Sequence, residues 1–262
     1  MIELYHHGTS VCAAKPRILL AEKELAWTGH YIDILKGEQF APDYLKLNPK
    51  AVVPTLVHDG HVLRESTLLC EYLDERFPDR PLKPADPVDR HAMRVWTKRI
   101  DEEVFPVTGP LTFAISHRHA VLANPPEMID EYINKLGPAE APMRRSRLER
   151  GIDDPDIHVS LSVYQKFFAD MDATLADRQW LAGDMFSLAE VGVIPFVNRL
   201  DMLQLSGMWT ASHPQLTDWW ERVKARPMFE DAMFKYIPMP LRQLMTDKGR
   251  KAWPKVQAML AQ

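Results

Sequence analysis

The chain has 262 residues, of which 46% are hydrophobic and 26% are charged, a composition typical of a globular protein with one large domain or two smaller ones. Its formal net charge of −4 gives no electrostatic basis for binding nucleic acid. No apolar run approaches the ~18 residues that a membrane-spanning helix needs, and the opening MIELYHHGTS lacks the basic and apolar regions of a signal peptide.

The cysteine and histidine content argues against a metal centre. Cys12 and Cys70 are the only cysteines, too few for a disulfide framework or a four-thiolate zinc site. The ten histidines form no HExxH motif and no tight cluster with cysteine, so we expect no metal site. Together these features predict a soluble, reduced, cytoplasmic protein that binds neither nucleic acid nor a membrane.

The first 78 residues alternate between strand and helix patterns. The expected elements are strands over residues 2–7, 27–34, 55–57 and 61–63, and helices over residues 11–23, up to Leu47, and over residues 65–77. Pro16 fits the first helix only within its first turn, which places the predicted start of that helix near residues 12–14. The order β-α-β-α-β-β-α predicts a small mixed sheet with helices on its faces.

The segment NPKAVVPTLVHDGHVLRES, residues 48–66, is the most informative part of the chain. Asp59-Gly60 predicts a tight hairpin turn between two short strands. Pro54 precedes the first of them, and a cis bond after Val53 would leave the N–H and C=O of Val53 free for the backbone of a ligand. This arrangement looks like a thioredoxin-type peptide clamp.

Glu65 and Ser66 follow the hairpin and begin the next predicted helix. The N–H groups and the dipole at a helix N-terminus favour a bound carboxylate. A proline before a strand and a serine at a helix start are also common separately, without any ligand. Both interpretations are open at this point.

The composition changes after residue 77. Residues 78–87, PDRPLKPADP, carry four prolines in ten residues and read as a linker. Helices are expected over residues 90–105, 159–175, 188–203, 214–225 and 228–236, with a C-terminal tail beyond about residue 240. The Pro- and Arg-rich residues 106–156 stay unassigned. A mixed α and β domain followed by an all-helical domain is the predicted organisation.

One helix has a clear start signal. Ser187 followed by Glu190 forms a capping box, and Phe186 before it is placed to pack as a hydrophobic staple. We interpret this as a folding device without a catalytic role. Four further residues, Cys70, Trp96, Trp219 and Trp220, are expected to be buried.

In this order and spacing, the motifs resemble the glutathione transferase superfamily. The likeness covers nearly the whole chain and rests on AEKEL at residues 21–25, NPKAVVPTL at 48–56, ESTLLCEYLDERFP at 65–78 and WLAGDMFSLAEV at 180–191. It implies an α+β fold with three parts: an N-terminal thioredoxin-like βαβαββα domain over residues 1–78, a linker over 79–89, and an all-α domain over 90–262.

Within the superfamily, the chain looks most like bacterial glutathione-dependent beta-etherases, which cleave lignin-derived aryl ethers. The likeness includes DPVDRHAMRVWTKRIDEEVF at residues 86–105, INKLGP at 133–138, RRSRLERG at 144–151, and a long insertion after the first helix of the second domain. It implies that glutathione is the co-substrate and that the chain is a cytoplasmic homodimer.

The loop over residues 7–12 opens the first helix. A free thiol has a pKa near ~8.5 and is only a few per cent ionised at neutral pH. Donors at a helix N-terminus lower that pKa by stabilising the thiolate. Ser10 matches the activating serine of phi-type enzymes and the cysteine of omega-type enzymes. Its hydroxyl would donate to the glutathione thiolate, or it only caps the helix.

Cys12 offers a second interpretation. CAAKPRILLAE at residues 12–22 resembles the CSLAPHIALRE pattern of beta-class transferases, which implies that Cys12 faces glutathione and could form a mixed disulfide with it. There is no CxxC motif, and cysteine is often a small buried apolar residue. The serine of the beta-etherase loop falls opposite Ala13, so that loop pattern is not reproduced.

The resemblance also implies the contacts to the rest of glutathione. Val53 and Pro54 would hold the cysteinyl backbone. Glu65 would accept from the γ-glutamyl ammonium, and Ser66 would donate to its carboxylate. Two further candidates are Gln39 for the glycyl end, which could equally be a solvated loop residue, and Lys50 in an assisting role.

The implied reaction is attack of bound thiolate on a hydrophobic, aromatic electrophile, with cleavage of a beta-aryl ether as the specific case. The alternatives are a glutathione-dependent thiol-disulfide oxidoreductase acting through Cys12, and a non-catalytic protein that binds glutathione or other ligands. Candidates to line the second-substrate site are Phe105, Phe113, His117, His119, Arg144, Arg145 and Arg147. For each of these residues a solvated or structural role is the favoured interpretation.

Overall fold

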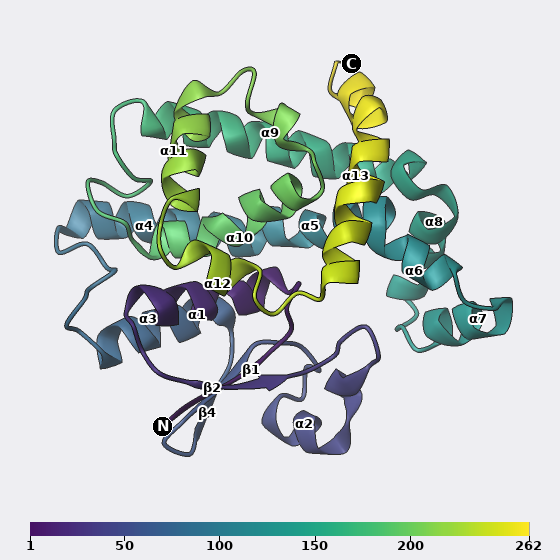
Figure 1. Cartoon of the computed structure of the whole chain (residues 1–262), viewed down its shortest axis with the longest axis horizontal. Coiled ribbons are helices and arrows are strands. Elements are labelled where there is room, and N and C mark those ends of the chain that lie inside the picture. Colours follow the sequence, from purple (N-terminus) through teal and green to yellow (C-terminus); the bar gives the residue numbers. More distant parts are fainter. Residues whose placement is uncertain (262) are drawn as a thin grey trace. The chain divides into compact units, whose positions relative to one another are not determined.

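The computed structural model describes residues 1–261. By packing, the chain divides into two compact units, each assembled from three stretches of sequence. The first unit comprises Met1–Ile100, Thr174–Pro195 and Asp218–Pro238, and the second comprises the remaining residues. Figure 1 labels the elements of both units.

The first unit contains a four-stranded mixed sheet in the order β2-β1-β3-β4. The strands are β1 (Ile2–His6), β2 (Thr28–Tyr31), β3 (Thr55–His58) and β4 (His61–Leu63). β1 runs parallel to β2 and antiparallel to β3, and β3 runs antiparallel to β4. Asp59 and Gly60 have φ angles of 50° and 85°, the left-handed conformation that a two-residue hairpin loop of type I′ requires. The predicted hairpin is confirmed.

Three helices accompany the sheet in the predicted order. They are α1 (Val11–Glu22), α2 (Pro42–Leu47) and α3 (Ser66–Arg76), with a 3₁₀ turn at Glu38–Phe40 before α2. α1 packs against α3, and the inner positions of the two helices, including Leu19 and Leu73, are fully buried. The mixed sheet with the expected β-α-β-α-β-β-α order is confirmed.

Two boundaries in this region differ from the prediction. α1 begins at Val11 because Ser10 caps it, so Pro16 is the sixth residue of the helix and lies beyond the first turn where it was expected. β2 ends at Tyr31 instead of residue 34. The strand stops because the Asp33 side chain accepts a hydrogen bond from the N–H of Leu35 at 3.1 Å, an Asx turn that redirects the backbone.

The Pro-rich segment after α3 is irregular, as predicted, and is fixed by buried polar contacts within the first unit. The ammonium of Lys23 donates to the carbonyls of Phe77 and Arg80 at 2.8 and 2.6 Å. It also pairs with the buried carboxylate of Asp74 at 2.7 Å, which in turn accepts from the N–H of Leu82 at 2.8 Å. The domain boundary drawn near residue 78 stays a prediction.

All remaining elements of the described residues are helical. The α-helices are α4 (Pro87–Arg99), α5 (Phe105–Thr112), α6 (Arg118–Leu122), α7 (Pro126–Asn134), α8 (Glu140–Arg150), α9 (Pro155–Leu175), α10 (Leu188–Met202), α11 (Pro214–Lys224), α12 (Phe229–Met233) and α13 (Met239–Leu260). π-helical turns at Ile100–Val104 and Phe113–His117 flank α5. No helix of the described residues is long and apolar enough to cross a membrane.

The second unit corrects two sequence expectations. Residues 106–156, which carried no assignment, contain most of α5 and all of α6, α7 and α8. The expected C-terminal tail is the 22-residue helix α13, which packs on the π-helical turn at Phe113–His117. Pro240 is the second residue of α13, a position where its missing N–H costs no hydrogen bond.

The capping box at the start of α10 is confirmed in full. The carboxylate of Glu190 accepts from the N–H of Ser187 at 2.9 Å and from its hydroxyl at 2.8 Å. The Ser187 hydroxyl oxygen accepts from the N–H of Ala189 at 3.1 Å, and Glu190 also accepts from the N–H of Leu181 at 2.6 Å. Both side chains are fully buried, and burial raises the pKa of Glu190.

Replacement of Ser187 by Ala should lower the free energy of unfolding by about 0.5–2 kcal/mol, because it leaves a helix N–H without its capping oxygen. Urea denaturation followed by circular dichroism measures the change. Ser212→Ala is the matched control, because Ser212 is exposed and its loss should change stability by less than about 0.5 kcal/mol. Equal stability of the two variants would show that the capping box does not stabilise the fold.

Candidate functional site

The loop between β1 and α1, residues 7–10, presents Ser10 at the start of a helix. Ser10 is the N-cap, with φ −70° and ψ 117°, and its Oγ accepts from the N–H of Ala13 at 3.1 Å. A hydroxyl carries one donor and two acceptor positions, so capping leaves its proton available. The cap and the donor role, which competed for Ser10 in the sequence interpretation, are chemically compatible.

A buried arginine fixes the backbone of this loop. The guanidinium of Arg17 donates to the carbonyl of His7 at 3.0 Å, to that of Gly8 at 3.1 Å and to that of Ala232, near the end of α12, at 2.9 Å. Burial lowers the pKa of Arg17 to about 10, so the side chain stays charged at neutral pH. The loop is therefore tied to a segment 215 residues away in sequence.

Tyr236, four residues after Ala232, also packs against this loop. A Cβ atom at Gly8 would lie 2.1 Å from the carbonyl oxygen of Tyr236, so no other residue fits at this position without displacing backbone. The ring of Tyr236 also meets the ring of His6 edge-on, with centroids 4.6 Å apart. Burial, together with the nearby charge of Arg17, lowers the pKa of His6 to about 3. His6 is thus a neutral packing residue beneath the loop.

Val53 and Pro54 form the predicted clamp geometry, with a cis peptide bond between them. The preceding carbonyl, that of Val52, accepts from the Tyr44 hydroxyl at 2.7 Å and from the Asn48 amide at 2.9 Å. Within the described residues, the N–H and C=O of Val53 are bonded to no other backbone group. Both groups of Val53 are therefore available to pair with an extended ligand backbone.

Glu65 and Ser66 lie at the N-terminus of α3, as predicted. Glu65 is the N-cap residue, in an unusual backbone conformation with φ 67°, and its side chain makes no capping hydrogen bond. Its carboxylate instead accepts from the ammonium of Lys50 at 2.6 Å, and both side chains are exposed. The structure thus brings together three of the predicted residues, with a carboxylate, an ammonium and the first N–H groups of a helix.

Gln39 lies on the 3₁₀ turn before α2 and is partly buried. Its side-chain oxygen has no hydrogen-bond partner among residues 1–261. No hydrogen bond joins Gln39 to the clamp or to Glu65, so the geometry of the protein alone does not place it in the same cluster as the other predicted residues.

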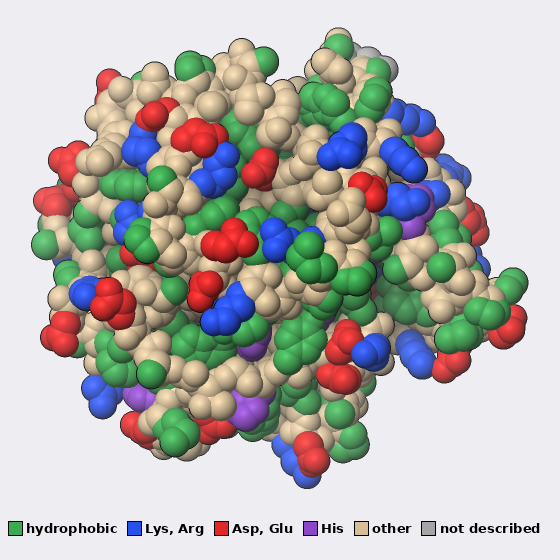
Figure 2. Space-filling view, viewed as in Figure 1, with side chains coloured by type: hydrophobic (Ala, Val, Ile, Leu, Met, Phe, Trp, Pro, Cys, Tyr) green, Lys and Arg blue, Asp and Glu red, His purple; other side chains and the backbone are tan. Residues whose placement is uncertain are grey.

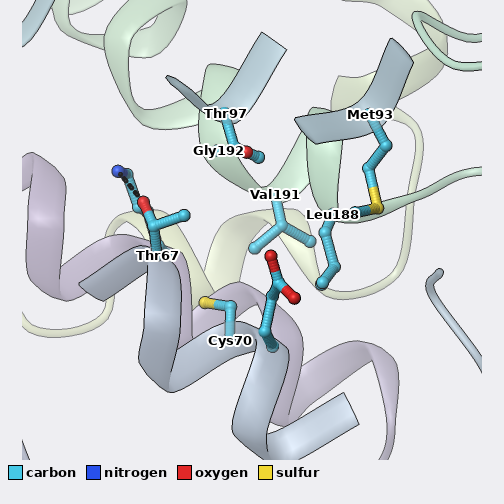
Figure 3. A pocket seen from close by; sticks show the side chains of 9 residues that line it. Thr67, Cys70, Met93, Thr97, Leu188, Val191 and Gly192 are labelled. Atoms are coloured by element: carbon cyan, nitrogen blue, oxygen red, sulfur yellow. Dashed lines mark hydrogen bonds between the residues drawn. The ribbon is translucent and has the colours of Figure 1, made fainter. Parts of the chain in front are cut away.

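The two cysteines differ in their surroundings. Cys12 is the second residue of α1 and is half-buried, whereas Cys70 on α3 is buried. Cys70 borders a small cavity of about 10 Å³ together with Thr67, Met93 and Val191 (Figure 3). That space holds about one water molecule, so this cavity is too small for a substrate. The expected burial of Cys70 is confirmed.

Most of the predicted second-substrate residues have structural partners in the second unit. Phe113 is buried, and the Arg144 guanidinium lies 4.4 Å from its ring centroid. Arg145 pairs with Asp130 at 2.9 Å, and Arg147 pairs with Asp156 at 2.6 Å. Of the others, Phe105 is exposed and His117 and His119 are partly buried. The structural interpretation favoured from the sequence fits the three arginines.

Sequence reasoning missed Arg17, Tyr44, Asn48 and Tyr236 as supports of the site. Arg17 and Tyr236 act through contacts across more than 200 residues, and no local pattern reports such a contact. The role of Asn48 could have been predicted from the sequence, because an Asn followed by Pro near a strand start often hydrogen-bonds nearby backbone.

The chain matches two family descriptions. Residues 4–81 match "Glutathione S-transferase, N-terminal domain", and residues 154–227 match "Glutathione S-transferase, C-terminal domain". Protein LigF of Sphingobium sp. strain SYK-6 is 32% identical over 248 residues, which cover 89% of this chain and 93% of LigF. Tetrachloro-p-hydroquinone reductive dehalogenase of Sphingobium chlorophenolicum is 30% identical, over 88% of this chain and 95% of the dehalogenase.

The fold agrees with these matches. The crystal structure of beta-etherase LigF superposes with a TM-score of 0.78 at 30% sequence identity, covering 89% of this chain and 99% of that structure. The likeness therefore extends over both halves of the chain and is not confined to the sheet and its helices.

The difference between the two cysteines gives a direct test. One thiol per native chain should react with 5,5′-dithiobis(2-nitrobenzoate), and the second only after denaturation, because Cys70 is buried and Cys12 is not. The fast thiol should be absent from Cys12→Ser and present in Cys70→Ser. Two thiols reacting at the same rate in the native protein would contradict the described packing of α3.

Proposed function

The chain belongs to the glutathione transferase superfamily, and from this premise we propose that it cleaves beta-aryl ethers with glutathione. It is a glutathione-dependent enzyme with glutathione as co-substrate. The observation that carries the specific proposal is the likeness to beta-etherase LigF, which reaches 30% identity and a TM-score of 0.78 over nearly all of both chains.

In this proposal, Ser10 activates the thiol. Its hydroxyl oxygen accepts from the N–H of Ala13, which leaves the hydroxyl proton free to be donated to the sulfur of bound glutathione. A donor at that point, together with the positive end of the α1 dipole, stabilises the thiolate over the thiol. The loop that carries Ser10 is fixed by Arg17, which supports a preorganised donor.

The remaining parts of glutathione bind to the clamp and to the α3 N-terminus. Val53 pairs with the cysteinyl backbone through its available N–H and C=O, beside Pro54. Ser66 and the first N–H groups of α3 receive the γ-glutamyl carboxylate, and Glu65 receives the ammonium. Lys50 already neutralises Glu65 at 2.6 Å, so binding of the ammonium replaces or shares that ion pair. Gln39 donates to the glycyl carboxylate.

The chemical step forms one bond and breaks one. The thiolate attacks the ether-bearing carbon, a C–S bond forms and the C–O bond to the aryl group breaks. The electron pair of the C–O bond leaves on a phenoxide, which takes a proton from solvent. The proton lost by the glutathione thiol on binding balances this uptake, so the products are a thioether and a phenol.

One observation supports a second candidate, a thiol-disulfide reaction with glutathione at Cys12. Cys12 is half-buried at the start of α1, two residues after Ser10, and a helix N-terminus lowers the pKa of a cysteine thiol. The Cys12 thiolate attacks the glutathionyl sulfur of a glutathione mixed disulfide, forms a disulfide with glutathione and releases the substrate thiolate. The thiolate of a second glutathione then attacks the glutathionyl sulfur of that disulfide, which restores the Cys12 thiolate and releases glutathione disulfide. This candidate requires Cys12 and tolerates the loss of Ser10.

The other partner proposals follow from family membership alone. We propose a cytoplasmic homodimer that accepts a hydrophobic, aromatic electrophile. Sedimentation equilibrium of the 30.2 kDa chain tests the proposed dimer. A mass of one chain at micromolar concentration would show that the protein is not a dimer.

Ser10→Ala should lower kcat/KM for release of a fluorogenic phenol from a beta-aryl ether by about 10–100-fold at pH 7, because a hydrogen bond to a charged group is worth about 1.5–3 kcal/mol. The loss should shrink as the pH rises, since the bound thiol then ionises without the donor. Ser10→Thr, which keeps the hydroxyl and the cap, should retain activity, and so should Cys12→Ala. Undiminished phenol release by Ser10→Ala would refute the role of Ser10, and loss of turnover only in Cys12→Ala would favour the disulfide reaction.

Glu65→Gln should raise the Kd for S-methylglutathione by about 10-fold or more, because it removes the acceptor of a charge-assisted hydrogen bond. Isothermal titration calorimetry measures this change. Glu75→Gln is the matched control on the same helix, since the exposed side chain of Glu75 pairs with Lys83 and lies outside the proposed site. If Glu75→Gln and Glu65→Gln bound the ligand equally well, the γ-glutamyl assignment would be wrong.

A further inference from the structure

The second unit contains a surface hollow of about 280 Å³ at which basic side chains converge from three separate parts of the chain. Arg118 comes from the start of α6, Arg150 from the end of α8, and Lys248 and Lys251 from consecutive turns of α13. Figure 2 shows blue side chains, with a purple histidine among them, gathered where Figure 1 draws α13 beside α6 and α8. The fold, and not a local charge run, therefore assembles this group.

The charge of the group is not neutralised by the protein. Among the described residues, none of the four cations forms an ion pair with a carboxylate, whereas Arg144, Arg145 and Arg147 nearby in sequence all do. Asp153 is the one carboxylate that borders the hollow, and it pairs with Lys255, outside the lining. Four unpaired positive charges around one concave surface repel each other, and an anion in the hollow would relieve that repulsion.

The guanidinium of Arg118 lies against the backbone at the end of α8. A Cβ at Gly151 would lie 1.9 Å from the Nη1 of Arg118, and Gly151 has a φ of +60°, a conformation that favours glycine. The Nε of Arg118 is buried without a hydrogen-bond partner. A guanidinium with an unsatisfied donor is the kind of group that planar recognition of an oxyanion uses.

His119 also borders the hollow, and its pKa responds to the positive charges around it. Its pKa is lowered, first by burial and then by the charges of Lys248, Arg118 and Lys251. The neighbouring cations therefore already disfavour one more positive charge at this point, which agrees with their lack of carboxylate partners.

The rest of the lining is apolar and includes Ile115 and Ile152. A volume of about 280 Å³ lies at the lower end of small-molecule sites, which are typically about 300–1,000 Å³. We propose that this hollow is a binding site for a small organic phosphate, with its phosphate on the four cations and a short apolar body against the isoleucines. None of the residues assigned to glutathione lines this hollow.

Phenyl phosphate is the probe, titrated by calorimetry into the full chain saturated with S-methylglutathione, so that the glutathione site is filled. Wild type should bind one equivalent, and Lys248→Ala/Lys251→Ala should raise the Kd by about 10-fold or more. Arg250→Ala is the matched control, because Arg250 is an exposed cation on the same helix outside the hollow, and its Kd should stay within about 2-fold of wild type. Binding should weaken with added salt, and phenol in place of phenyl phosphate should not bind.

Absence of binding to wild type, or an equal Kd in the double variant, would overturn the proposal. An equal rise of the Kd in Arg250→Ala would also overturn it, since binding would then depend on the overall charge of the protein and not on the residues of the hollow. A double variant that lost its wild-type circular dichroism would be replaced by Lys251→Gln, tested against the same control. Glu65→Gln should bind phenyl phosphate normally, so failure of this proposal and failure of the proposed function give different results.

Discussion

The candidate site depends on one buried cation. Arg17 donates to two carbonyls of the loop that carries Ser10 and to a third carbonyl contributed by Ala232. A buried guanidinium is costly unless its donors are satisfied, so these carbonyls must face Arg17, and the conformation of the loop follows. The position of Ser10 at the head of α1 is in this sense a consequence of where Arg17 is buried.

In the proposed function, two helix N-termini and the segment that enters β3 together hold a peptide-like ligand. α1 presents Ser10, α3 presents Ser66 beside Glu65, and the Val53–Pro54 segment presents unpaired backbone groups. All three belong to the first unit. Each is supported by residues that do not themselves face a ligand, as Asn48 and Tyr44 support the clamp through the carbonyl of Val52. The chemistry thus rests on backbone geometry more than on any single reactive side chain.

The sequence predicted those parts of the structure that are encoded over a few residues. The Asp59-Gly60 turn and the Ser187–Glu190 capping box were read correctly, because each is decided by local backbone conformation and short-range hydrogen bonds. α13 was not predicted, and the prolines near its start and in its interior, Pro240 and Pro254, are residues that usually disfavour a helix unless they lie in its first turn. The contacts of Arg17 with Ala232 and of Lys50 with Glu65 were missed because they join positions that only the folded chain brings together. The site residues themselves were named through family resemblance, and the structure adds their supports.

The discontinuity of the first unit has a consequence for how the protein is made. The loop with Ser10 is synthesised early, yet one of the three carbonyls that satisfy Arg17 belongs to a residue added 215 positions later, and Tyr236 closes over Gly8 later still. During translation, a nascent chain that holds only the sheet and α1 to α3 has a charged guanidinium without its full set of acceptors. The active conformation of the loop is therefore completed near the end of synthesis. A fragment cut after the sheet and its three helices would lack the segment that packs on this loop.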